Sequence, residues 1–272
     1  MKHSLIYCVF FALMFAITAC GDDGDSATRP SEESSSSVAL SSLSSAGIAP
    51  MSSWSGGEAG TIGSSNSVVQ SSSSESMSVV DPASVVKGTF SDSRDGQTYK
   101  TVTIGTQTWM AQNLNYETAN SYCHNDSVEY CSKYGRHYTW AAAKKACPSG
   151  WHLPAKAEFE TLLSAVGGDS VAMAKLKSTS GWIWNNDVGK IGNGTDDYSF
   201  SALPAGGRTS FRYNNGAYFN EGRNAFFWSS SEYSDGKDSD CAYYMSLWYG
   251  DGIAYLGYYG KDDFFSVRCV KD

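Results

Sequence analysis

The chain has 272 residues and carries 20 Lys and Arg against 28 Asp and Glu, for a formal net charge of -8. This length exceeds that of a disulfide-rich miniprotein and suffices for one domain of ordinary size with additional segments. The acidic balance argues against non-specific nucleic-acid binding, which depends on clustered basic side chains that displace counterions. Aromatic residues make up 14% of the chain and charged residues 18%, which predicts a well-packed domain and excludes disorder throughout.

Residues 1–19 are interpreted as a lipoprotein signal peptide. A basic start precedes an almost entirely apolar run, which at about 15 residues is too short for a helix that spans a bilayer. The run ends in ITAC (17–20), which resembles the lipobox that bacteria cleave before its cysteine. This resemblance implies a lipidated Cys20, and two or more acyl chains would hold the protein durably on the membrane. We therefore expect attachment to the outer membrane with exposure at the cell surface, and an ordinary secretory signal is the alternative.

Residues 20–86 are predicted to form the lipid anchor and a disordered linker. About a third of this stretch is serine, and neither helical nor strand periodicity is present. A flexible chain of this length reaches roughly 40–50 Å, enough to hold a domain away from a membrane surface.

Residues 87–272 are predicted to form one domain. The predicted elements, in chain order, are a strand over 98–104, helices over 139–147, 155–166 and 171–177, a hairpin with strands over 241–248 and 253–258, and a last strand over 265–269. Alternating TYKTVTI indicates the first strand. The spacing of Phe159, Leu162, Leu163 and Val166 indicates the second helix, and the glycine pair after it ends that helix.

Several segments of this domain resemble one known family. They are IGTQTWMAQNLNY (104–116), YTWAAAKKACPSGWHLPAKAEFETLL (138–163), FSALPAGGR (200–208), FWSSSEY (227–233) and the ending FSVRCVKD. Together they are similar to the Fibrobacter succinogenes major paralogous domain family, which in turn resembles the C-type-lectin-like fold. The resemblance implies an α+β, C-type-lectin-like domain with two main helices, short antiparallel sheets and a long irregular loop region.

The cysteines agree with export to an oxidising compartment. In the lectin-like fold a cysteine of the first helix bonds one of the final strand, so the resemblance implies a disulfide between Cys147 and Cys269. Cys123 and Cys131 enclose a short polar loop and form the natural second pair. Cys241 is left over, and we interpret it as a buried free thiol.

We expect no catalytic residue, no metal and no cofactor. His124, His137 and His152 lack the spacing of metal ligands, and His152 is interpreted as a structural residue. The serine run 229–231 precedes Glu232, but no base is located that could activate a serine nucleophile.

The aromatic hairpin is the most informative candidate surface. Alternation places Tyr244 and Trp248 on one face of its first strand and Met245 and Leu247 on the other. Either one face stacks on sugar rings or on a partner protein, or both faces are buried, and the pattern leaves both readings open. The candidate ligand-binding residues are Tyr244, Trp248, Tyr255 and Tyr258.

The expected function is a non-catalytic binding or adhesion module on the cell envelope, for polysaccharide or a surface protein. One alternative is an oxidoreductase of the related formylglycine-generating type, which uses a pair of reactive cysteines near the C-terminus that binds copper. Cys241 and Cys269 are 28 residues apart, and Cys269 belongs to the implied disulfide, which argues against this alternative. The other alternative is a structural envelope protein without a discrete ligand.

Overall fold

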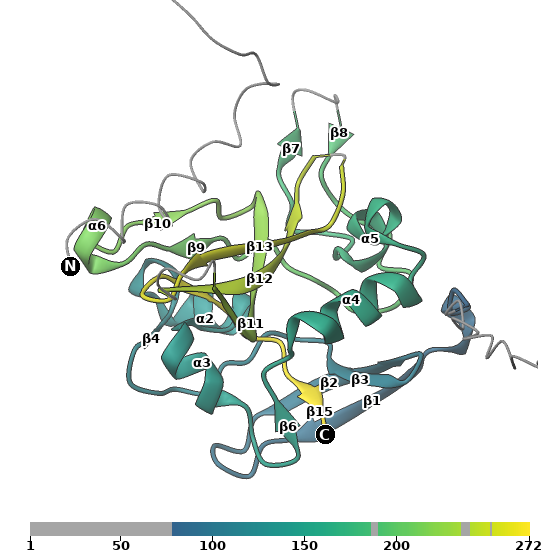
Figure 1. Cartoon of the computed structure of the whole chain (residues 1–272), viewed down its shortest axis with the longest axis horizontal. Coiled ribbons are helices and arrows are strands. Elements are labelled where there is room, and N and C mark those ends of the chain that lie inside the picture. The colour runs from purple at the N-terminus through teal and green to yellow at the C-terminus, as the bar shows by residue number, and fades with distance from the viewer. Residues whose placement is uncertain (1–77, 186–189, 235–239, 251) are drawn as a thin grey trace, which may run out of the picture. The chain divides into compact units, whose positions relative to one another are not determined.

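The computed structural model describes residues 78–185, 190–234, 240–250 and 252–272 (Figure 1). The predicted signal peptide, the predicted lipidation site Cys20 and residues 20–77 of the predicted linker lie outside the described residues. Among the helices in the described part, none has the length and apolar character that crossing a membrane requires.

The first sheet is antiparallel and has five strands. In spatial order they are β1 (Val86–Ser91), β2 (Thr98–Ile104), β3 (Gln107–Met110), β15 (Val270–Lys271) and β6 (Trp151–His152). β2 has the predicted bounds, and its alternation buries Val102 and Ile104 on one face. β15 lies inside the sheet because Val270 pairs with Trp109 on one side and with His152 on the other.

The second sheet has eight strands. Its main path is β10 (Tyr218–Phe219), β9 (Gly207–Arg208), β14 (Phe264–Ser266), β11 (Asn224–Tyr233), β12 (Cys241–Trp248) and β13 (Tyr255–Gly260). β5 (His137–Thr139) pairs with β14, and β4 (Ser121–Tyr122) pairs with β5. A separate short ribbon joins β7 (Trp184–Asn185) to β8 (Lys190–Ile191).

The helices are short. They are η1 (Pro82–Ser84), η2 (His124–Asp126), α2 (Val128–Tyr134), α3 (Trp140–Ala146), α4 (Lys156–Ala165), α5 (Asp169–Leu176) and α6 (Phe211–Asn214). α3 begins where predicted, because the Thr139 hydroxyl accepts a hydrogen bond from the Ala142 amide. α4 has 10 residues and starts after Ala155, whose amide donates to the Glu158 carboxylate at 2.8 Å.

The β11–β12 ribbon separates two apolar cores. Phe227, Met245 and Leu247 face a core completed by α4, α5, β2 and β3. Phe226 and Tyr244 face a second core completed by α3, β5 and β14. Figure 1 shows α4 and α3 on different sides of these strands. Both faces of the ribbon are therefore buried along most of its length.

The expected fold class is wrong. Thirteen of the fifteen described strands form two sheets of five and eight, and the longest described helix has 10 residues, so the domain is mostly β. A C-type-lectin-like arrangement of two main helices with small sheets does not describe it. Many strands have only two or three residues, as in β4, β6, β9 and β15, and such strands have too little periodicity to be recognised from local sequence.

Both predicted disulfides are confirmed. Cys147, at the end of α3, bonds Cys269, and Cys123 bonds Cys131. Cys241 is buried at the first position of β12, as predicted. Its sulfur takes part in a disulfide, so the prediction of a free thiol is wrong.

Candidate functional site

Tyr244 lies in the core of the domain. Its side chain is 8% exposed and packs against Phe226 and Phe265, with ring centroids 5.8 and 5.3 Å away. Burial raises the pKa of its hydroxyl above the usual value of a tyrosine. Tyr244 therefore has no open ring face to offer a ligand, although the alternation pattern made it a candidate.

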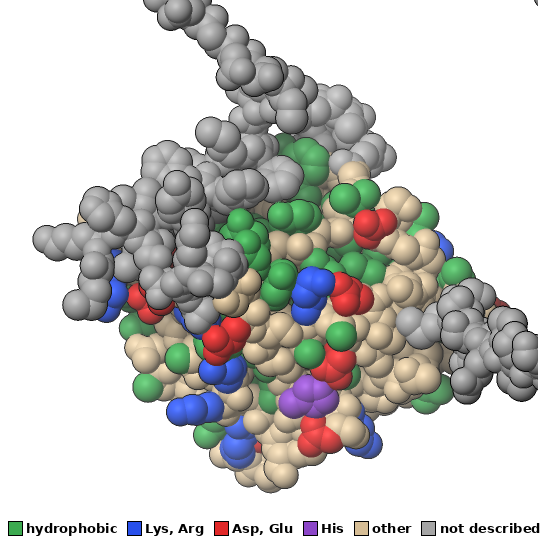
Figure 2. All heavy atoms as spheres, viewed as in Figure 1, with side chains coloured by type: hydrophobic (Ala, Val, Ile, Leu, Met, Phe, Trp, Pro, Cys, Tyr) green, Lys and Arg blue, Asp and Glu red, His purple; other side chains and the backbone are tan. Residues whose placement is uncertain are grey.

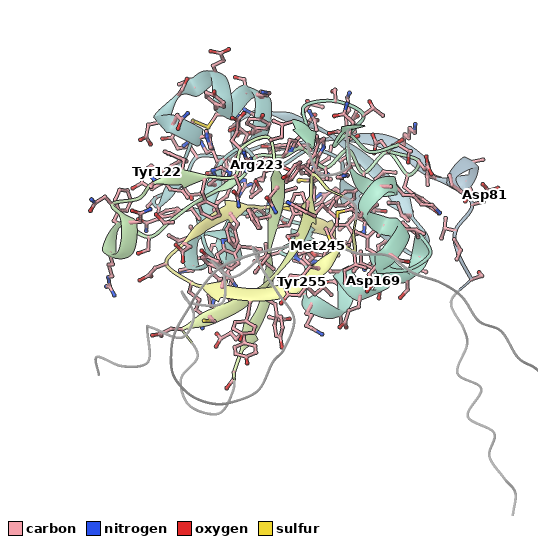
Figure 3. The ribbon with its side chains drawn as sticks, turned by 90° about the horizontal axis from the view of Figure 1, so that it is seen from above. Asp81, Tyr122, Asp169, Arg223, Met245 and Tyr255 are labelled. Atoms are coloured by element: carbon pink, nitrogen blue, oxygen red, sulfur yellow. A yellow bond between two sulfur atoms is a disulfide. The ribbon has the colours of Figure 1, made fainter. Side chains whose placement is uncertain are left out.

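The other two tyrosine candidates lie on opposite faces of β13. Tyr255 is half-buried beside Tyr244, with ring centroids 6.4 Å apart. Tyr258 points the other way and stacks on Tyr233 at 3.7 Å. Figure 3 shows Asp169 beside the hairpin that carries Met245 and Tyr255, and the Ala254 amide donates to the Asp169 carbonyl there at 2.9 Å. The candidate tyrosines do not form one stacking surface.

Trp248 is the predicted residue that remains open to solvent. It ends β12 and is 38% exposed. Its ring covers Gly250, where a Cβ atom would come within 2.7 Å of the indole, so the turn needs a glycine for the ring to lie flat on it. The Tyr249 ring meets the indole edge to face at 5.0 Å. The result is a flat aromatic ring supported from below and from one side.

The backbone at Trp248 is tied to α5. The Trp248 amide donates to the sulfur of Met173 at 3.0 Å, and its carbonyl accepts from the ammonium group of Lys177 at 3.0 Å. The Tyr249 amide donates to the Arg223 carbonyl at 2.7 Å. These bonds fix the backbone at Trp248, and the contacts of the ring with Gly250 and Tyr249 restrain the indole, which lowers the entropy lost on binding.

Further apolar side chains lie exposed near this tryptophan. Ile253, at the end of the same turn, is 53% exposed, and Ile183 is 36% exposed. The Ile183 amide donates a hydrogen bond to the Gly222 carbonyl. The next residue, Arg223, faces the ring of Tyr249, which places Ile183 on the same side of the domain as Trp248. Figure 2 shows hydrophobic side chains gathered over β12 and β13. We call Trp248, Tyr249, Ile253 and Ile183 the Trp248 surface.

Arg268, which sequence reasoning missed, ties three of the motif segments together. It is fully buried and donates to the Asn113 amide oxygen at 2.8 and 3.1 Å, and to the carbonyls of Phe200 and Ser201. Burial lowers the pKa of its guanidinium to about 9, and the nearby Asp196 carboxylate opposes this, so the group stays charged at neutral pH. Its position inside a motif segment was the available signal.

Arg208, the last residue of FSALPAGGR, has a structural role of another kind. It is 5% exposed, and its guanidinium lies 4.4 to 4.6 Å from the ring centres of Tyr122, Phe211 and Tyr218. It also donates to Asp126 at 3.1 Å. This cage holds η2, next to the Cys123 disulfide, against β9.

His124 and His137 form a buried pair whose ring centroids are 5.9 Å apart. Burial lowers both pKa values, and for His137 burial together with the charges of His124 and Arg208 lowers the pKa to about 3. Both rings are therefore neutral at physiological pH. No group of three or more His, Cys, Asp or Glu within the described ranges is arranged to hold a metal ion.

We expect His137 to make the protein less stable in acid. An unfolded histidine has a pKa near 6.5, so between pH 6.5 and about 3 the unfolded chain binds a proton that folded His137 refuses. Neutral His137 therefore costs no stability above pH 6.5, and its titration lowers the free energy of unfolding progressively as the pH falls toward 3. Urea midpoints across this range should fall less steeply for His137→Phe than for the unchanged protein.

The control for this experiment is His152→Gln. Burial alone lowers the pKa of His152, but bonds to Asp272 at 2.6 Å and Glu158 at 2.9 Å raise it overall. Titration of His152 therefore makes the protein more stable as the pH falls, which is opposite to the effect of His137. Asp263, whose pKa burial raises to about 7, also gives the opposite slope in both proteins. Equal pH slopes for His137→Phe and the unchanged protein would contradict the assignment.

The serine run of FWSSSEY serves the fold. Ser229 is fully buried, and its hydroxyl accepts a hydrogen bond from the Ser231 amide at 3.2 Å. The Ser231 hydroxyl in turn accepts from the Lys156 amide at the start of α4, at 3.0 Å. No histidine bonds to either hydroxyl among the described residues, so neither serine has an activating base.

Comparison with known proteins gives one match. The family model described as the Fibrobacter succinogenes major domain matches residues 102–271. No curated protein matches the chain. No solved structure matches it either.

Proposed function

The chain belongs to the Fibrobacter succinogenes major domain family, and from this premise we propose that it is a non-catalytic binding module of the cell envelope. Its ligand is polysaccharide, which stacks on the Trp248 surface. The proposal includes the lipid anchor at Cys20 and display at the outer membrane, both read from the sequence.

The exposed and immobilised indole of Trp248 carries this proposal. Sugar rings present flat C–H faces, and an aromatic ring buries such a face at little cost in side-chain entropy. The indole is 38% exposed while its backbone is bonded to Met173 and Lys177. A rigid, partly apolar ring suits an extended neutral polymer better than a compact charged ligand.

The cysteine, serine and histidine residues considered for catalysis are engaged in the fold, which also supports a binding role. Cys269 is bonded to Cys147, so it is not available as one of two reactive thiols. Ser229 and Ser231 bond to backbone amides, and His152 joins Asp272 to Glu158. These contacts argue against the formylglycine-generating alternative.

Replacing Trp248 by alanine should abolish most of the polymer binding. Loss of a central aromatic contact costs about 2 kcal/mol, which corresponds to roughly thirtyfold weaker binding. We expect this loss in sedimentation assays with insoluble cellulose, xylan and chitin. Thermal unfolding should change little, because the bonds that anchor this turn come from the Trp248 backbone.

Phe211→Ala is the matched control, since Phe211 is an exposed aromatic residue (51%) in α6, outside the Trp248 surface. It should bind as the unchanged protein does. Equal losses in the two variants would mean non-specific adsorption, and retention by Trp248→Ala would refute the site. Absence of binding by the unchanged protein would favour the structural alternative.

A further inference from the structure

A polar hollow lies between the start of β2, the segment after β3 and the end of α2. It encloses about 390 Å³, part of which is open to solvent. Its lining includes Gln97, Tyr99, Gln112, Asn113, Asn115 and Leu203. Most of these residues belong to the segments 104–116 and 200–208, which resemble the family.

Four carboxamide side chains face this hollow, and three of them retain unused hydrogen-bonding groups. Gln112 uses only its oxygen, which accepts from the Lys100 amide at 2.8 Å. The Gln97 side chain makes no hydrogen bond to the described residues. The Asn115 oxygen is covered by protein and has no hydrogen-bond partner within the described part of the chain. This oxygen cannot reach a ligand while it is covered, so Asn115 offers the hollow its side-chain nitrogen, which has no hydrogen-bond partner among the described residues.

Asn113 and Tyr99 make the hollow rigid. The Asn113 amide nitrogen donates to the Tyr134 carbonyl at 2.8 Å, and its oxygen accepts from buried Arg268. Tyr99 is 2% exposed, and its hydroxyl accepts a hydrogen bond from the backbone N–H of Asn115 at 3.1 Å. The bonds of Asn113 and the bond from the Asn115 backbone to Tyr99 therefore hold this segment in place.

The electrostatics of the hollow favour a neutral ligand. No carboxylate is among its described lining residues, and Lys133 is the only cation there. The Lys133 ammonium lies 3.8 Å from the Glu221 carboxylate, which offsets its charge. Carboxamides both donate and accept, and sugar hydroxyls do the same, so the two match group for group.

We propose that this hollow binds one neutral sugar unit through Asn115, Gln97 and Gln112. The site shares no residue with the Trp248 surface. It goes beyond the proposed function, because it takes a single soluble sugar whereas the Trp248 surface takes the face of a polymer.

The test is titration of the full-length protein with glucose, galactose, mannose, xylose and glucuronate, with binding measured by ligand-observed NMR. We expect at least one neutral sugar to bind more tightly than glucuronate. Asn115→Ala and Gln97→Ala should each weaken that binding about fivefold, as expected for the loss of one hydrogen bond. Asn214→Ala is the matched control, because it removes an exposed amide from α6 outside the hollow.

The stability of Asn115→Ala separates a ligand site from a structural role. Because the Asn115 oxygen has no partner in the protein, its removal should leave the melting temperature unchanged or raise it. A marked drop in melting temperature with sugar binding intact would overturn the proposal. If Asn115→Ala fails to fold, normal binding by exposed Gln97→Ala overturns it instead.

Absence of binding by every neutral sugar, or tighter binding of glucuronate, would also overturn the proposal. Neither result affects the polymer assay with Trp248→Ala. Conversely, loss of polymer binding in that variant with sugar titration unchanged would leave the hollow in place. The two sites can therefore fail separately.

Discussion

Replacing Arg268 by methionine is expected to lower the free energy of unfolding by about 3–5 kcal/mol. The guanidinium is fully buried and supplies donors to the Asn113 oxygen and to the carbonyls of Met110, Phe200 and Ser201. Methionine fills part of the space between the Phe200 and Phe227 rings but donates no hydrogen bond. Removing the charge relieves its desolvation, yet four acceptors, three of them in buried bonds, lose the donor that the guanidinium supplies, and we expect this loss to dominate. Equilibrium urea unfolding with both disulfides intact measures the difference.

Two further variants sharpen the test of Arg268. Arg268→Lys keeps the charge but cannot reach all four acceptors, so its stability should fall between those of Arg268→Met and the unchanged protein. Arg212→Met removes an exposed arginine 3.6 Å from Asp262 and should change stability by less than about 0.5 kcal/mol. Equal stability of Arg268→Met and Arg212→Met would mean that the three motif segments do not depend on the guanidinium.

Removing the Cys147–Cys269 disulfide should cost about 5 kcal/mol. The bond closes a loop with a sequence separation of 122, and in the chain-entropy model the stabilisation grows with the logarithm of loop length. This loss is comparable to the whole stability of a small domain, which is 5–15 kcal/mol. We expect the double alanine variant at 147 and 269 to unfold well below the temperature of the unchanged protein in calorimetry.

The Cys123–Cys131 bond provides the matched control. Its sequence separation is 8, so the same model predicts a loss of about 2–3 kcal/mol for the corresponding double alanine variant. The order of the two melting temperatures is the decisive result. A larger loss from the short loop than from the long one would contradict the entropic explanation.

Local elements were predictable because each has its own signal in the sequence. Thr139 caps α3, the buried residues of α4 repeat at helical spacing, and β2 alternates. The hairpin was also predicted, although β13 begins at Tyr255, two residues later than expected. The third predicted helix, α5, begins at Asp169, also two residues from the expected start.

The predicted last strand shows where local reasoning fails. Residues 265–269 were expected to form one strand, but β14 ends at Ser266 and β15 begins at Val270. Between them the chain passes from one sheet to the other, where the carbonyls of Val267 and Cys269 accept from the amides of Leu114 and Met110. These partners are far away in sequence, and no periodicity within the segment reveals them.

The prediction of the Cys147–Cys269 disulfide is confirmed while that of the fold class is wrong, and the difference has a physical reason. A sulfur–sulfur bond fixes the distance between the end of α3 and the segment before β15, and that prediction is confirmed. It does not determine how many strands lie between these two points, and the described strands form two sheets of five and eight. Confirmation of one contact inferred from a resemblance therefore does not validate the whole fold.

The candidate ligand residues could be predicted only in part. Alternation made Trp248 a candidate but left its exposure open, and the structure exposes it at the end of β12, next to a glycine-containing turn. Burial of Tyr244 depends on Phe226 and Phe265, which come from two other strands. The polar hollow depends on α2 and on Leu203 meeting the segment after β3, which again is a long-range contact.

The place of β15 in the first sheet sets the order of events during biosynthesis. β3 and β6 contact each other in the sheet only through Val270 and Lys271, so a gap separates them until these residues have left the ribosome. A nascent chain stalled before residue 270 presents two unpaired strand edges, which are sites for aggregation and for chaperone capture. Closure of this half of the domain therefore waits for residues 270 and 271.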